Sequence, residues 1–112
     1  MPDTPVRGDL LAGSLDMLIL RTLTLGRAHG YAVARHIESL SNDVLRVEQG
    51  SLYPALDRLL RKGWVTAEWR KSPTGRNARY YTITRSGRKQ LEARAAEHKR
   101  VMAAIARVME QT

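Results

Sequence analysis

Hydroxyl and cationic side chains recur at helical spacing between Gln49 and Gly63. If the stretch QGSLYPALDRLLRKG forms a helix, with about 100° of rotation per residue, its leucines share one face and its polar residues lie opposite. The outward residues are Ser51, Pro54, Asp57, Arg58, Arg61 and Lys62, with Tyr53 on the flank. The hydroxyl and cationic groups among them can donate hydrogen bonds to phosphate oxygens and base edges. Taken alone, the stretch fits insertion into a nucleic-acid groove and an ordinary amphipathic helix with a solvated face equally well.

Proline and glycine predict the ends of this helix. Pro54 must lie near the first turn, because deeper in a helix it would remove a backbone hydrogen bond and clash with the preceding turn. The helix is therefore expected to start near Gly50 or Ser51, and Gly63 is expected to end it. Its buried face is predicted to consist of Leu52, Leu56, Leu59 and Leu60.

The net charge favours an anionic partner. The 112 residues contain 19 Lys and Arg against 11 Asp and Glu, a formal charge of +8. Most of the cations lie between residues 58 and 100, where acidic residues are few. A positive field of this kind attracts nucleic acid first and an acidic membrane surface second.

Two strands joined by a basic loop are predicted directly after the cationic helix. Val65, Ala67 and Trp69 alternate with polar residues, which predicts a strand with these three on its buried face, and Tyr80–Thr84 predicts a second strand. The connection Lys71–Arg79, KSPTGRNAR, has a proline and a glycine for turning and almost nothing apolar to bury. We therefore expect a hairpin with a basic tip.

Two helices are predicted before the cationic one. The first starts at Ser14 as its cap and ends at Gly26, and its apolar surface is wider than one core contact needs, which suggests a partner subunit. The second spans His29–Leu40, with Arg35, His36 and Glu38 outside. Its first turn, at Gly30 and Tyr31, offers backbone N–H groups to a phosphate. After it, Val44–Val47 is predicted to add a short edge strand.

A long last helix is predicted from Thr84 or Ser86 to about Glu110. Its apolar positions are separated by 4, 3, 4, 3 and 4 residues, the spacing of a heptad seam: Leu91, Ala95, His98, Met102, Ile105 and Met109. A helix of some 25 residues is about 37 Å long, too long to lie wholly on so small a core. We expect its second half to pack on a second copy of the chain, together with Leu15 and Leu18 of the first helix.

The expected fold is mainly α with a small β hairpin, arranged as a winged helix-turn-helix with a long C-terminal dimerisation helix. Residues 1–13 are predicted to be a flexible N-terminal arm, residues 14–84 the winged-helix DNA-binding domain and residues 85–112 the dimerisation helix. In such a fold the third helix enters the major groove, and the wing reaches an adjacent backbone or the minor groove. Base reading is expected from Ser51, Tyr53 and Arg58, with a phosphate contact by the Tyr53 hydroxyl as the alternative for that residue. Asp57 is expected either to orient the Arg58 guanidinium or to lower non-specific affinity.

Four blocks of sequence resemble the PadR family of bacterial transcription regulators. They are LDMLIL, HGYAVARHIE, QGSLYPALDRLLRKGWV and GRNARYYTITRSGRKQL, which together span residues 14 to 91. The resemblance implies a homodimeric repressor that binds a palindromic operator in double-stranded DNA and is released by a small-molecule effector at the dimer interface. The predicted DNA contacts are Tyr31, Ser51, Tyr53, Pro54, Arg58, Arg61, Lys62, Lys71, Gly75, Arg76, Asn77 and Arg79.

The last helix departs from some short relatives, which carry an aromatic residue on its dimer-facing side. Here no aromatic residue follows Tyr81, so stacking of a flat ligand between the two last helices is not expected. His98 on the seam is interpreted as a hydrogen-bonded interface residue, with a pH-sensitive role as the alternative.

Other functions are left with little support. The runner-up is a basic winged-helix module that binds RNA or a protein. HExxH, a Gly-rich phosphate loop and paired carboxylates at a plausible site are missing, so no enzymatic activity, cofactor or metal is expected. His29 and His36 are interpreted as surface or capping residues. The lack of cysteine excludes disulfides and fits the cytoplasm, and Leu15–Leu25 is too short and polar to span a membrane.

Overall fold

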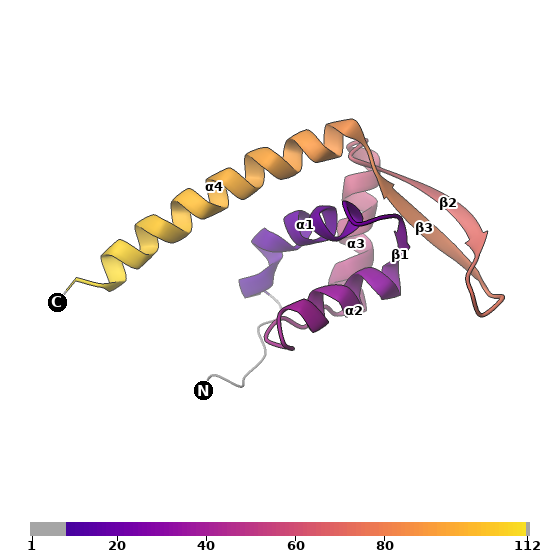
Figure 1. The fold of residues 1–112 in the computed structure, drawn as a ribbon, viewed down its shortest axis with the longest axis horizontal. Coiled ribbons are helices and arrows are strands. Elements are labelled where there is room, and N and C mark those ends of the chain that lie inside the picture. The colour runs from indigo at the N-terminus through magenta and orange to yellow at the C-terminus, as the bar shows by residue number, and fades with distance from the viewer. Residues whose placement is uncertain (1–8, 112) are drawn as a thin grey trace.

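The computed structural model describes residues 9–111, with side chains from residue 13 onward. Four helices and a small antiparallel sheet make up this described part, as expected for a winged helix-turn-helix (Figure 1). In chain order they are α1 (Asp9–Leu23), β1 (Ala28–His29), α2 (Gly30–Leu40), α3 (Gln49–Arg61), β2 (Val65–Lys71), β3 (Asn77–Ile83) and α4 (Arg85–Met109). None of the helices in this described part combines the length and apolarity needed to cross a bilayer.

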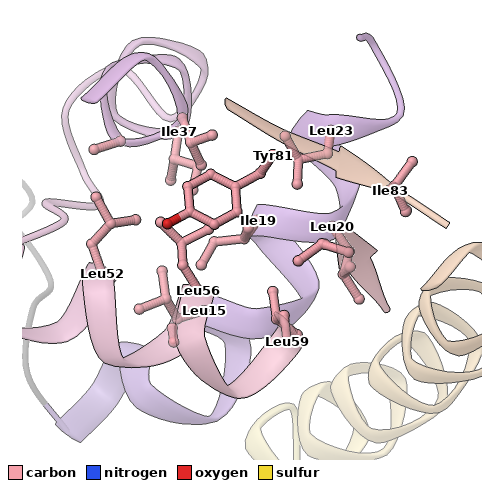
Figure 2. Close-up of a cluster of buried hydrophobic side chains, with 14 of the residues drawn as sticks. Leu15, Ile19, Leu20, Leu23, Ile37, Leu52, Leu56, Leu59, Tyr81 and Ile83 are labelled. Carbon is pink, nitrogen blue, oxygen red and sulfur yellow. The ribbon is translucent and has the colours of Figure 1, made fainter. Parts of the chain in front are cut away.

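The core lies where α1, α2 and α3 meet the inner end of the sheet. Figure 2 shows its side chains pointing toward one another from these elements. The labelled residues are Leu15, Ile19, Leu20, Leu23, Ile37, Leu52, Leu56, Leu59, Tyr81 and Ile83, all buried. Three of the four leucines predicted for the buried face of α3 are therefore in the core, and the fourth, Leu60, is partly buried against it.

The first helix begins before its predicted start. Helix α1 begins at Asp9, so Ser14 lies within the helix and does not cap it. The helix ends at Leu23, and Gly26 follows with a φ of 141°, a conformation that favours glycine. The predicted flexible arm is thus helical from residue 9, and its first eight residues lie outside the described part of the chain.

The sheet has three strands in the order β1-β3-β2, all antiparallel. Strands β2 and β3 pair from Val65 opposite Ile83 to Lys71 opposite Asn77, and form the predicted hairpin. The prediction of an edge strand at Val44–Val47 is wrong, because the third strand is Ala28–His29. Residues 44–47 instead follow a reversal at Asn42 and Asp43, whose φ values are 52° and 62°.

Helix α2 begins at a histidine cap and carries a buried acid. The Nδ1 atom of His29 accepts a hydrogen bond from the Ala32 N–H at 3.2 Å, which confirms the capping interpretation. Glu38 was predicted to lie outside, but it is buried and accepts the Val47 N–H at 3.0 Å. Arg35 and Arg46 lie 3.6 and 3.8 Å from its carboxylate. Glu38 therefore fixes the turn that leads from α2 into α3.

Helix α4 starts at the end of the sheet, packs along α1 and then extends beyond the other elements (Figure 1). Its cap is Thr84, whose hydroxyl accepts the Gly87 N–H at 3.0 Å. Gly87 packs so closely on the carbonyl of Trp64 that a side chain there would clash with it. From Ala95 to Gln111 every residue is exposed in the single chain. The long last helix was thus predicted with nearly the right bounds.

Candidate nucleic-acid interface

The N-terminal half of α3 presents its outward side chains beside the start of α2. Ser51, Tyr53 and Pro54 are exposed, while Leu52 between them is buried. Pro54 is the sixth residue of α3, deeper than the first turn in which it was predicted, so the helix lacks one backbone hydrogen bond there. This part of α3 therefore keeps hydroxyl groups on the surface while its leucines hold it in the core.

Tyr53 is held in place by a glycine on the neighbouring helix. A side-chain carbon added at Gly30 would lie only 2.9 Å from Cε1 of Tyr53 and 3.2 Å from its hydroxyl oxygen. The ring therefore packs directly on the first turn of α2, yet 46% of the residue remains exposed. This contact fixes the ring on the line between the two helices and keeps its outer edge available to a ligand.

A groove of about 790 Å³ separates these helices from the hairpin. Its walls combine the start of α2, Tyr53 of α3 and the inner side of the wing, which we define as β2, β3 and the loop between them. Five predicted DNA contacts from three elements line it: Tyr31, Tyr53, Arg76, Asn77 and Arg79. Residues far apart in sequence thus form one concave surface.

The wing closes with a tight, internally bonded turn. The Ser72 N–H donates to the Arg76 carbonyl at 2.7 Å, and the Gly75 N–H donates to the Ser72 carbonyl at 2.9 Å. Gly75 has a φ of 85°, which explains why glycine is needed there. The predicted loop, Lys71–Arg79, was too long, because pairing continues out to Lys71 and Asn77. The basic side chains therefore project from paired strands as well as from the turn.

The wing cations are available to an anion. Lys71, Arg76 and Arg79 are exposed, and none of the ion pairs within residues 13–111 involves them. The Arg79 guanidinium lies 5.8 Å from the centre of the Tyr81 ring, which orients it without neutralising it. By contrast, Arg70 is paired with Glu68 at 3.0 Å.

Arg58 does not line the groove, and its predicted role in base reading stays a prediction. Its Nη2 atom donates to the Asp16 carboxylate on α1 at 2.9 Å, and Asp16 is buried. Of the two roles predicted for Asp57, orienting Arg58 is wrong, because Asp57 pairs with Arg61 at 2.9 Å, whereas lowering non-specific affinity stays a prediction. Arg58 therefore ties α3 to α1. Asp16 is an acidic residue within the apolar run of the first helix, and this was the sequence signal that it needs a cationic partner.

The cations at the end of α3 lie outside the groove. The Lys62 ammonium sits 4.6 Å from the centre of the Trp64 ring, and Arg94 of α4 lies 5.0 Å from the same ring. Neither Arg61 nor Lys62 lines the groove. Any contact that they make with nucleic acid is therefore separate from the surface formed with the wing.

The residues predicted for the dimer interface fall into two groups. Leu15 and Leu91 are only 2% and 8% exposed, because they already pack in the core of the single chain, so they are not available as an interface surface. Leu18 is half-buried. The other predicted residues are exposed on α4: Ala95, His98, Met102, Ile105 and Met109.

Sequence reasoning missed Trp69 as a site residue. The period-2 pattern predicted that it would be buried with Val65 and Ala67, but 71% of it is exposed and it lines the groove. The alternation itself is correct, because Val65 is buried on the same face. The core simply ends before the strand does. The position of Trp69 next to the basic tip was the available signal.

Residues 19–93 match the model described as the transcriptional regulator PadR-like family. A relative from Lysinibacillus sphaericus, called uncharacterized protein X, is 30% identical over 105 residues, which cover 94% of this chain and 96% of the relative.

Solved structures share the fold over nearly the whole chain. A PadR family transcriptional regulator from Eggerthella lenta is 28% identical, with a TM-score of 0.77 over 93% of this chain and 88% of that one. A transcriptional regulator from Clostridium thermocellum is 24% identical, with a TM-score of 0.81 over 89% of this chain and 97% of that one. A PadR-like transcriptional regulator from Bacillus cereus is 24% identical, with a TM-score of 0.80 over 94% of this chain and 100% of that one. The last two likenesses support the fold alone.

Proposed function

The chain belongs to the PadR-like family of transcriptional regulators, and from this premise we propose that it acts as a homodimeric repressor bound to a palindromic operator. It is a DNA-binding regulator and not an enzyme. The observation that carries the proposal is the groove in which predicted DNA contacts from α2, α3 and the wing converge. The finer statements concern how that groove meets the duplex and how two chains combine.

The N-terminal half of α3 is proposed to enter the major groove. Ser51 and Tyr53 are exposed there and offer hydroxyl groups, which both donate and accept hydrogen bonds at base edges. The ring of Tyr53 packs on Gly30, so its hydroxyl would meet the duplex close to the start of α2. Base reading is thereby proposed for Ser51 and Tyr53, of which Tyr53 lines the groove beside the wing, while Arg58 is already paired with Asp16.

Phosphate binding is proposed for the wing and the start of α2. Lys71, Arg76 and Arg79 carry charge that none of the described carboxylates pairs with. The first turn of α2 lines the same groove, and the N-terminal end of a helix favours an anion. Together these groups would fix the orientation of α3 without themselves reading sequence.

The second half of α4 supports the proposal of a dimer. Apolar side chains recur along one face of it and are exposed in the single chain: Val101, Met102, Ile105, Val108 and Met109. A helical segment without tertiary partners is marginal in water, and its stability normally comes from packing its apolar face. A second copy of the same helix supplies a matching face, and it would place two copies of α3 on the same duplex.

An effector site at the dimer interface remains part of the proposal. A ligand bound between the chains would act by changing the spacing of the two α3 helices, which must match the operator. The described seam after Tyr81 carries methionines and a histidine and no aromatic residue. The chemistry of an effector there would therefore rest on adaptable apolar contacts and not on ring stacking.

The proposal is tested by selecting duplexes from a random pool and measuring mass and affinity together. We expect light scattering to give a dimer, and fluorescence anisotropy at ~150 mM salt to give much tighter binding of the selected duplex than of its scrambled version. A monomeric mass at every salt concentration, or equal affinity for the selected and scrambled duplexes, would contradict the proposed function. Preferential binding of an RNA hairpin would favour the alternative of an RNA-binding module.

A further inference from the structure

The indole ring of Trp69 is the part of the wing that phosphate binding leaves unexplained. It is a large, mainly apolar side chain, yet 71% of the residue is exposed. Val65, on the same face of β2, is buried in the core, and Ala67 is half-buried. The face of β2 that packs on the helices thus becomes more exposed along the strand, and Trp69 on this face is uncovered.

The surroundings of Trp69 combine aromatic rings with positive charge. Arg79 stands directly opposite Trp69 in the register of β2 and β3, so both side chains lie on the same face of the wing. Tyr31 and Tyr53 line the same groove from the helices and are 63% and 46% exposed. Three exposed aromatic side chains therefore share one groove with two unpaired wing arginines, counting Arg76.

We propose that Trp69 is a DNA-contacting residue whose indole packs against the sugars and base edges of the duplex while Arg79 holds the neighbouring phosphate. The assignment rests on the proposed function, because it takes the duplex as the occupant of the groove. Apolar side chains are used in this way by proteins that enter the minor groove. The positive charge beside the ring attracts the polyanion, and the ring then removes its own apolar surface from water.

The contact differs from a phosphate contact in its response to salt. Removing an arginine that neutralises one phosphate flattens the plot of log K against log salt by about one, whereas removing an apolar contact releases no counterion. Trp69→Ala should therefore weaken binding of the selected duplex by roughly tenfold to a hundredfold, with an unchanged salt slope. Arg76→Ala should flatten that slope. Thr66→Ala, on the opposite face of β2, is the matched control and should leave affinity unchanged.

A second measurement observes the ring itself. The chain has two tryptophans, so Trp64→Phe leaves Trp69 as the single emitter. In the free protein acrylamide should quench this emission readily, because the ring is exposed. Addition of saturating duplex should lower the quenching constant, measured from fluorescence lifetimes so that static quenching by the bases does not interfere. Trp69→Phe should keep most of the affinity that Trp69→Ala loses.

The outcomes separate the inference from its premise. Failure of the unmodified protein to bind the duplex would refute the proposed function. If the unmodified protein binds the duplex tightly, two results would overturn the role of Trp69 alone. One is an affinity of the Trp69→Ala variant within twofold of the unmodified protein. The other is an indole whose emission acrylamide still quenches in the complex. Protection of the ring by single-stranded RNA but not by duplex DNA would overturn it as well.

Discussion

Ile105→Asp is expected to convert the proposed dimer into monomers. Ile105 is 48% exposed in the single chain, so a partner can bury about half of it. Full burial of isoleucine contributes about 1.5–3 kcal/mol, which gives about 1 kcal/mol for this half and about 2 kcal/mol over the two symmetric copies. The variant loses this and places two carboxylates in an apolar seam, at a further cost of several kcal/mol. Dimer affinity should fall by about a thousandfold or more.

The assay is sedimentation equilibrium over a range of protein concentrations, with circular dichroism as the test of folding. The core is built without Ile105, so the variant should remain folded. Ala103→Asp is the matched control, because Ala103 is exposed on the other side of α4 and should tolerate a carboxylate. If Ile105→Asp leaves the dimer intact, the exposed face of α4 is not the dimer seam, and the reasoning is refuted.

Two further predictions concern stability. Gly87→Ala should destabilise the fold by about 2 kcal/mol in thermal melts, because the added methyl would meet the Trp64 carbonyl and force the backbone to shift. A double-mutant cycle of Asp16→Asn and Arg58→Met should give a coupling free energy of about 1 kcal/mol in denaturant melts, since the pair is partly exposed on the arginine side.

Each of these has an outcome that would contradict it. Gly13→Ala, at a helical position where an added side chain meets nothing within 4 Å, is the control for Gly87→Ala and should not destabilise. Equal melting of the two alanine variants would mean that the packing at Gly87 is loose. An Arg58→Met variant of unchanged stability but altered base preference would restore Arg58 as a residue that reads bases.

The elements could be predicted largely from periodicity and turn residues. The leucine spacing of α3, the glycine after it and the alternation of β2 each depend on local chemistry, and the structure has all three. The N-terminal bound of α1 was missed because Ser14 resembles a cap, whereas the helix runs through it from Asp9. The strand at Ala28–His29 was missed because two residues are too few to show an alternation of apolar and polar side chains. Only its pairing with β3 defines it as a strand.

Side-chain partners could not be predicted in the same way. Arg58 lies on the polar side of a helical wheel, but its length lets it reach Asp16 on α1, which only the crossing of the two helices brings near. The sequence pattern places Glu38 on the surface, but the turn after α2 folds back so that the Val47 N–H donates to its carboxylate. Trp69 was assigned to the correct face, and its exposure depends on where the core ends. Each is a consequence of tertiary geometry.

We propose that two copies of this chain place two α3 helices on symmetric half-sites about one helical turn apart. The most direct test compares the selected palindrome with the same half-sites separated by about five additional base pairs, half a turn of DNA. The added half turn places the second half-site on the opposite side of the duplex, where the second chain of the dimer cannot reach it. The affinity for the lengthened site should therefore fall to that for a single half-site. Equal affinity for the two spacings would contradict the account.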